Sequence, residues 1–293
     1  MEFSTIGRRA AFLGGLATAA AAAVPRDAAI PIEVVQGRCV VPVLLDGRAA
    51  RMLLDTGADI SLVTRAAVAR LGLRPDPWVS TTLRGASGLE ERHANVDVHS
   101  ARAGAVPLFQ RVAATGLSLP VTSSDIGGAD GLLGGDILQH YTLDLNIPAA
   151  RLRLATAPST ARPPDAVHLQ RLRRSQLLAP VLLDGHKLVA LLDTGASASL
   201  VNARGLYRLG LATKQPQHDP AIPMLALGGE TTVHVHRFSE LRIGAFRAAA
   251  PSLLTQAVPE PAFDLILGLD VLGRQRLLLS YTELTLVFAG NDP

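Results

Sequence analysis

Apolar residues in this chain come in short runs that alternate with polar residues or stop at turn-forming pairs. Residues 30–43 alternate in this way, and the apolar run that ends at Asp46-Gly47 is followed by a second run at 49–54. Two apolar runs joined by Asp-Gly are typical of a β-hairpin. Alternation returns in two later segments, 141–154 and 276–288. This pattern predicts that most of the chain is β-sheet.

Helical patterns in the chain are brief. Arg65–Leu71 and Ala203–Leu209 each predict a short helix, because each segment runs into a glycine, and glycine commonly follows the last turn of a helix. We therefore expect an all-β fold with short helices between some of the strands.

The same pattern is written twice along the chain. Residues 41–63 and 179–201 are identical at fifteen of twenty-three positions, and each contains Leu-Leu-Asp-Thr-Gly-Ala. The second copy of this motif follows the first by 138 residues. A later pair of matching segments, 130–138 and 264–272, extends the duplication. Because this period is far too long for a solenoid repeat, the sequence indicates two similar lobes in one chain.

The two lobes are expected at residues 30–154 and 168–290. The segment between them, 155–167, is rich in proline, serine and threonine and is interpreted as a linker. A chain of 293 residues is long enough to give each of two small domains its own core. An apolar content of 48% with 18% charged residues indicates a globular protein.

Charge and cysteine content narrow the possible partners. The net charge is +3 and the arginines are scattered, so neither a nucleic-acid partner nor a polybasic membrane surface is indicated. Cys39 is the only cysteine, so it has no disulfide partner within the chain. We expect it to act as a small buried apolar residue.

Residues 1–24 have the layout of an export signal. Arg8-Arg9 precede an alanine-rich apolar run that ends in small residues near Ala21–Ala23. With Phe12-Leu13, this segment resembles a twin-arginine signal whose spacing is one residue looser than usual. The run from Ala10 to Val24 is shorter than the roughly 20 residues that cross a bilayer. We therefore expect export to the periplasm or the exterior with cleavage; an uncleaved membrane anchor is the alternative.

The candidate chemistry lies in the two aspartates of the repeated motif, Asp55 and Asp193. Two carboxylates within hydrogen-bonding distance do not both ionise easily, so the pair shares one proton over a range of acidic pH. The ionised carboxylate can take a proton from a bound water while the protonated one donates to a carbonyl oxygen. This is general acid–base hydrolysis of an amide, and it requires neither a metal nor a cofactor.

The residues that follow each aspartate suit this task. Gly57 and Gly195 have no Cβ, so the backbone can turn sharply and bring its N–H groups near the carboxylate. Thr56 and Thr194 carry hydroxyls that can bond to backbone across the interface between the lobes.

The repeated Leu-Leu-Asp-Thr-Gly-Ala motif, with a later apolar-apolar-Gly segment in each half, resembles the pepsin/retropepsin superfamily of aspartic proteases. The resemblance covers most of 40–154 and 178–288. It implies two retropepsin-like β-barrel lobes with an active-site cleft between them. It also assigns roles to residues of this chain: catalysis to Asp55 and Asp193, bracing of the lobes to Thr56 and Thr194, and threading behind the active-site turns to Leu132-Leu133-Gly134 and Ile266-Leu267-Gly268.

Ala58 and Ala196 follow the retroviral form of the motif, whereas pepsin-like enzymes usually have serine or threonine there. That hydroxyl would hydrogen-bond the aspartate and favour its charged form. Without it, we expect the dyad to titrate higher and to work nearer neutral pH, and activity confined to strongly acidic pH would count against this hypothesis.

The resemblance further implies glycine-rich hairpin flaps that close over the substrate. Two turns fit this description, and each fits an ordinary hairpin turn equally well. The residues concerned are Gly85, Ala86, Ser87 and Gly88 in the first lobe, and Gly228 and Gly229 in the second.

Five other polar positions could carry further chemistry. His234 and His236 lie two apart on a predicted strand, but zinc needs a third protein ligand and none is evident, so we expect no metal. Asp59 is expected to be solvated, with a structural or substrate-facing salt bridge as the alternative. Asp136 and Asp270 are expected to cap the short helices that follow them.

The sequence thus predicts an exported, single-chain aspartic endopeptidase that binds a polypeptide substrate in extended conformation. The duplication favours a monomer in which Asp55 meets Asp193 within one chain. One alternative is a non-catalytic peptide-binding module with the same fold. Another is a pair of chains in which Asp55 meets its own copy.

Overall fold

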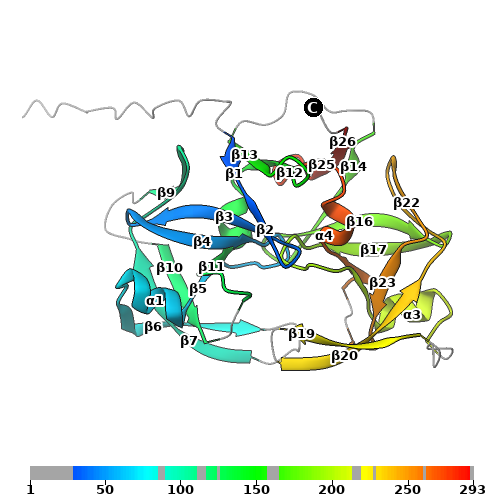
Figure 1. Cartoon of the computed structure of the whole chain (residues 1–293), viewed down its shortest axis with the longest axis horizontal. Coiled ribbons are helices and arrows are strands. Elements are labelled where there is room, and N and C mark those ends of the chain that lie inside the picture. Colours follow the sequence, from blue (N-terminus) through cyan, green and yellow to red (C-terminus); the bar gives the residue numbers. More distant parts are fainter. Residues whose placement is uncertain are drawn as a thin grey trace, which may run out of the picture.

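The computed structural model describes residues 29–84, 90–110, 117–123, 126–156, 165–212, 219–226, 229–259 and 262–290. Strands make up most of this part of the chain, and the two halves form two similar lobes that lie side by side (Figure 1). The predicted all-β, two-lobed fold is confirmed.

The first half contains short helices only between strands. Its elements are β1 (Ile30–Pro31), β2 (Glu33–Val35), β3 (Arg38–Leu45), β4 (Arg48–Leu54), β5 (Leu62–Thr64), α1 (Arg65–Leu71), β6 (Pro75–Arg84), β7 (Glu90–Val98), β8 (Ser100–Ala103), β9 (Val106–Gln110), β10 (Leu117–Thr122), β11 (Gly131–Leu133), α2 (Gly135–Leu138), β12 (Thr142–Asn146) and β13 (Arg151–Ala155).

The second half repeats this order. Its elements are β14 (Val167–His168), β15 (Gln170–Leu172), β16 (Gln176–Leu183), β17 (His186–Leu192), β18 (Leu200–Val201), α3 (Ala203–Arg208), β19 (Ala221–Ala226), β20 (Gly229–Arg237), β21 (Glu240–Ile243), β22 (Phe246–Ala249), β23 (Ser252–Thr255), β24 (Leu265–Leu267), α4 (Leu269–Leu272), β25 (Arg276–Ser280) and β26 (Thr285–Ala289).

Each lobe is built on one large sheet, and the two sheets have equivalent strand orders. The first is β6-β7-β10-β5-β11-β4-β3-β8-β9, and the second is β19-β20-β23-β18-β24-β17-β16-β21-β22. Every strand of the first order is matched by its counterpart in the second. The duplication seen in the sequence is therefore a duplication of the fold.

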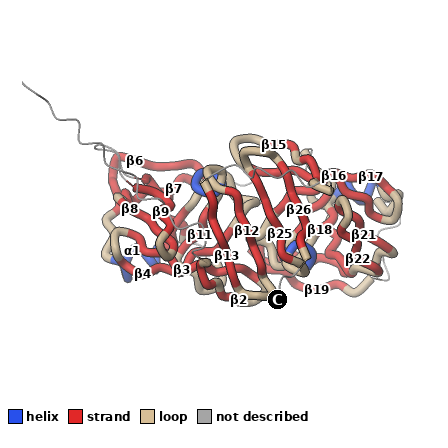
Figure 2. The backbone as a smooth tube through the Cα atoms, turned by 90° about the horizontal axis from the view of Figure 1, so that it is seen from above, coloured by secondary structure: helices blue, strands red, loops and turns tan. Residues whose placement is uncertain are grey.

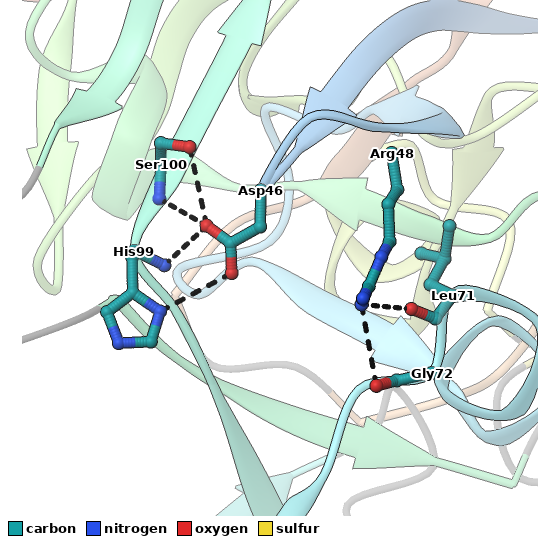
Figure 3. Close-up of polar contacts among 6 residues, drawn as sticks. All are labelled: Asp46, Arg48, Leu71, Gly72, His99 and Ser100. Carbon is teal, nitrogen blue, oxygen red and sulfur yellow. Dashed lines mark hydrogen bonds and ion pairs between the residues drawn. The ribbon is translucent and has the colours of Figure 1, made fainter.

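Tight Asp-Gly turns join β3 to β4 and β16 to β17, as the sequence predicts. Asp46 and Gly47 both have positive φ, at 47° and 77°, which is the geometry of the turn that suits a two-residue hairpin. The Asp46 carboxylate also accepts hydrogen bonds from the backbone N–H groups of His99 and Ser100, at 2.8 and 2.7 Å (Figure 3). The turn thus fastens the hairpin to the start of β8.

The short helix α1 has the ends that its sequence predicts. The Thr64 side chain caps it by accepting from the Ala67 N–H, and Gly72 ends it in the left-handed conformation. The Arg48 guanidinium donates to the carbonyls of Leu71 and Gly72 at this C-terminal end (Figure 3). The matching helix α3 ends at Arg208, one residue earlier than expected.

A third sheet joins the lobes, with strand order β1-β13-β12-β25-β26-β14. Its central strands, β12 from one half and β25 from the other, lie side by side between the lobes (Figure 2). Asp144 is paired with Leu278, and the Arg276 guanidinium binds both Asp144 carboxylate oxygens at 2.7 and 2.8 Å. One hydrophobic core runs from these strands into both lobes. The lobes are therefore parts of one folded unit.

Cys39 lies fully buried in β3, as expected, and burial raises the pKa of its thiol to about 12. Residues 1–24, the predicted export signal, lie outside the described residues. In the described part of the chain, every helix is too short or too polar to span a bilayer.

Candidate active site

The two Asp-Thr-Gly turns are held by strands that thread behind them. β11 lies between β4 and β5, parallel to the first and antiparallel to the second, and the Asp55 N–H donates to the Leu133 carbonyl at 3.0 Å. β24 lies between β17 and β18 in the same way, and the Asp193 N–H donates to the Leu267 carbonyl at 3.0 Å. The apolar segments expected behind the turns are present in both lobes.

Each aspartate is anchored by the backbone of its own turn. Asp55 Oδ1 accepts from the N–H groups of Gly57 at 2.9 Å and Ala58 at 3.0 Å. Asp193 Oδ1 accepts from Gly195 and Ala196 at the same two distances. These bonds fix the direction of each carboxyl group, which is the preorganisation that acid–base chemistry needs.

The two carboxyl groups meet across the interface between the lobes. A Cβ added to Gly57 would lie 2.4 Å from the Cγ of Asp193, and a Cβ added to Gly195 would lie 2.4 Å from the Cγ of Asp55. Such a distance is well inside van der Waals contact. Each carboxyl group therefore packs over the glycine of the other lobe, and this contact is possible only because glycine has no side chain.

Thr56 and Thr194 brace the two turns against each other. Each threonine hydroxyl accepts from the backbone N–H of the other threonine at 3.1 Å. Each also donates to a carbonyl of the opposite lobe: Thr56 to Leu192 at 2.8 Å, and Thr194 to Leu54 at 2.6 Å. Both threonines are buried, so these four bonds are protected from water.

The dyad lies in surroundings that resist ionisation. Burial and the nearby Asp193 charge raise the pKa of Asp55 to about 8, against the hydrogen bonds from Ala58 and Gly57. Burial also raises the pKa of Asp193, opposed by the Ala196 and Gly195 N–H groups, by Asp55 and by the Arg38 guanidinium. Burial therefore raises the pKa of both carboxyl groups, whereas the effect expected from the missing hydroxyl and the working pH stay predictions.

Asp59 is half-buried and hydrogen-bonded to the opposite lobe, which corrects the expectation that it is simply solvated. Its Oδ1 accepts from the Ser175 N–H at 3.1 Å and from the Ser175 hydroxyl at 2.9 Å. Gln176 Nε2 donates to the Gly57 carbonyl at 2.5 Å. The start of β16 therefore holds the first active-site turn by hydrogen bonds from the opposite lobe.

The capping role expected for Asp136 and Asp270 is also corrected. Both lie inside helices whose N-caps are glycines without a side-chain bond. Asp136 Oδ1 instead accepts from the Ser61 hydroxyl at 2.6 Å, and Asp270 Oδ1 from the Ser199 hydroxyl at 2.6 Å. Each serine then accepts from the glycine N–H behind its turn, at 2.9 Å. That both serines and both aspartates recur in the duplicated segments was the signal for this pairing.

The flap residues are not all placed. Gly85, Ala86, Ser87, Gly88 and Gly228 lie outside the described residues, and Gly229 begins β20. The flanking strands form the hairpins β6–β7 and β19–β20, which lie along the same side of the two lobes (Figure 1). The flap assignment stays a prediction.

His234 and His236 take part in a local contact on β20. The His236 Nδ1 lies 2.7 Å from an Asp219 carboxylate oxygen, and the His234 Nδ1 lies 3.5 Å from the Asp219 carbonyl oxygen. Among the residues that the structure describes, no three side chains of histidine, cysteine, aspartate or glutamate come together as metal ligands.

Comparison with known protein families gives one family. The sequence model described as aspartyl protease matches residues 41–137 and again 179–271. Each match contains one Asp-Thr-Gly turn and the strand that threads behind it, and the two matches cover more than half of the chain. A comparison with curated proteins gave no match. The double match follows the duplicated fold lobe by lobe, and the chain belongs to the aspartyl protease family.

Proposed function

We propose that this chain is an endopeptidase that hydrolyses peptide bonds with a water activated between Asp55 and Asp193. The observation that carries the proposal is the reciprocal contact in which each carboxyl group packs over the glycine of the other lobe. Each lobe supplies one carboxyl group, so the chain needs no second copy to complete the pair. Membership of the aspartyl protease family supports the same reaction class.

The geometry supports general acid–base catalysis. One carboxylate takes a proton from the water as the water attacks the peptide carbonyl carbon, and the other carboxyl group gives its proton to the carbonyl oxygen. When the tetrahedral intermediate collapses, the C–N bond breaks and the leaving nitrogen receives a proton. Burial of both carboxyl groups supports this division of labour, since it makes double ionisation costly.

The proposed substrate is a polypeptide in extended conformation. The hairpins β6–β7 and β19–β20 provide strands on the side of the molecule where flaps would close, and an extended peptide can add backbone hydrogen bonds there. We further propose that the active species is a monomer, that it is exported, and that it uses no cofactor.

Incubation of the purified protein with a peptide library tests the proposed function. The protein should cleave peptides, and a pepstatin-like transition-state mimic should inhibit it. Asp55→Asn should lower kcat/KM by at least about a hundredfold, because it removes one partner of the acid–base pair. The matched control is Asp97→Asn, an exposed aspartate in β7, which should keep full activity.

Circular dichroism and thermal unfolding should show that Asp55→Asn is folded. A wild-type protein that binds the mimic but cleaves no peptide would overturn the proposal and indicate a peptide-binding module. Cleavage that survives in Asp55→Asn would show that the dyad is wrongly assigned.

A further inference from the structure

The two active-site turns do not by themselves decide which aspartate holds the shared proton. Their N–H donors lie at the same two distances, 2.9 and 3.0 Å, from Asp55 and from Asp193. Both aspartates are half-buried at the same interface. Any preference of the proton for one carboxyl group must therefore come from residues around the turns that differ between the lobes.

The first residues of β3 and β16 differ in this way. Arg38 and Gln176 are separated by the same 138 residues as the two aspartates. The register of β3 with β4 sets Val40 opposite Leu53, so Arg38 lies level with Asp55 beyond the paired residues. The register of β16 with β17 places Gln176 level with Asp193 in the same manner. One equivalent position thus carries a positive charge and the other is neutral.

In both halves, the start of this strand lies against the active-site turn of the opposite lobe. Gln176, which is half-buried, donates to the Gly57 carbonyl beside Asp55. Arg38 is also half-buried, and a Cβ added to Gly127 would lie 3.3 Å from its Nη1. Gly37, the residue before Arg38, lies against the second lobe just after the Asp193 turn: a Cβ added to Gly37 would lie 3.1 Å from the Cβ of Ser197, so Arg38 lies beside the Asp193 turn. Its effect on Asp193 agrees, since it opposes the rise that burial causes in the pKa of that carboxyl.

Other charged groups near the dyad do not cancel this effect. Asp59 is held by Ser175, on the side of the dyad where Gln176 lies. Tyr281 is fully buried, and burial together with the Asp55 charge raises the pKa of its hydroxyl, so it stays neutral. Arg171 donates to the Tyr281 carbonyl and acts on Tyr281. Arg38 forms no ion pair with a carboxylate in the described part of the chain.

We propose that Arg38 is a positioning residue that keeps the negative charge on Asp193 and leaves the shared proton on Asp55. The proposal rests on the proposed peptidase function and assigns the two roles within it. Asp193 takes the proton of the attacking water, and Asp55 gives its proton to the carbonyl oxygen. On collapse, the proton on Asp193 passes to the leaving nitrogen, and the hydroxyl proton of the intermediate returns to Asp55.

Charge-swap variants test this assignment through the pH profile of kcat/KM. Arg38→Gln makes both sides neutral, so the pKa of the ionised carboxylate should rise and the acid limb should move to higher pH by about half to one unit. Arg38→Lys keeps the charge, and its acid limb should stay at the wild-type pH. The double variant Arg38→Gln with Gln176→Arg should bring the acid limb back down. An acid limb in Arg38→Gln that coincides with the wild type would overturn the proposal.

A titration that needs no substrate separates this proposal from the proposed function. With ¹³C-labelled aspartate and assignments from Asp55→Asn and Asp193→Asn, NMR should show Asp193 ionising at lower pH than Asp55 in the wild type. The double swap should reverse that order. If the order is unchanged by the swap, Arg38 does not place the proton, whether or not the protein cleaves peptides. Absence of cleavage with the expected order would refute the peptidase function alone.

Discussion

The two lobes are nearly equal inside each active-site turn and unequal where the lobes touch outside it. The donors to Asp55 and Asp193 lie at matching distances, and Thr56 and Thr194 exchange matching bonds. Outside the turns, Asp59 has a bond to the opposite lobe, whereas its counterpart Ser197 lies near Gly37. The paired geometry of the turns is therefore preserved in both lobes, while the residues around the turns differ in how they hold the lobes together and how they distribute charge.

Substitution of the two glycines gives the strongest test of whether the two active-site turns are equally needed for activity. Gly57→Ala and Gly195→Ala should each lower kcat/KM by at least about a hundredfold, because each new Cβ would displace the opposing carboxyl group. The two losses should be similar in size. The control is Gly290→Ala, where a Cβ meets nothing within 4 Å and activity should not change. A large loss of kcat/KM in only one of the two variants would show that the two turns are not equivalent.

The threonine brace should also respond equally in the two lobes. Thr56→Val and Thr194→Val each leave a buried N–H and a buried carbonyl without their partners, at a cost of about 1–3 kcal/mol in the free energy of unfolding. Because the two hydroxyls lie in contact within one buried network, the cost of the double variant should differ from the sum of the single costs. Denaturant unfolding measures this, with exposed Thr82→Val in β6 as the control. Additive losses would show that the brace is not one unit.

The raised pKa values at the dyad predict how stability depends on pH. The pKa of Asp55 is about 8 in the folded chain against 3.8 as an ordinary value. Between these values the folded chain binds more protons than the unfolded chain, so the free energy of unfolding falls as pH rises from about 4 to about 8. Asp55→Asn should make this fall shallower. Urea midpoints across that pH range measure it, and an unchanged slope would contradict the shift.

The inequality of the lobes is tested at the joining sheet. Asp144 binds Arg276, whereas its counterpart across the pseudo-twofold axis is the apolar Leu278. Asp144→Ala leaves the half-buried Arg276 without its bidentate partner and should cost about 1–3 kcal/mol in the free energy of unfolding.

The matched control for that variant is Glu33→Ala. It removes the exposed ion pair with Arg51, so it should cost less than about 1 kcal/mol. Equal losses in the free energy of unfolding would show that the pair in the joining sheet contributes no more than the exposed pair does.

Features that repeat within the sequence could be predicted from it. The Asp46-Gly47 turn, helix α1 and both Asp-Thr-Gly motifs depend on local chemistry that short segments carry, and the duplication showed that the aspartates form a pair.

Features that depend on how the lobes sit together could not be predicted. The Asp59–Ser175 bond joins residues 116 apart, and nothing local to either residue indicates the other. The sheet of β12 and β25 combines strands that each looked like the closing strand of its own half. Asp136 was misread for a different reason. A position after glycine suggested a cap, but the nearby Ser61 hydroxyl offered it a stronger hydrogen bond.

We propose that one chain completes its own catalytic pair from Asp55 and Asp193. The most direct test is kcat/KM for peptide cleavage by folded Asp193→Asn, which retains Asp55. We expect a loss of at least about a hundredfold, because Asp55 alone lacks its acid–base partner. Retention of wild-type activity by Asp193→Asn would contradict the account, since Asp55 would then have to work alone or with its own copy in a second chain.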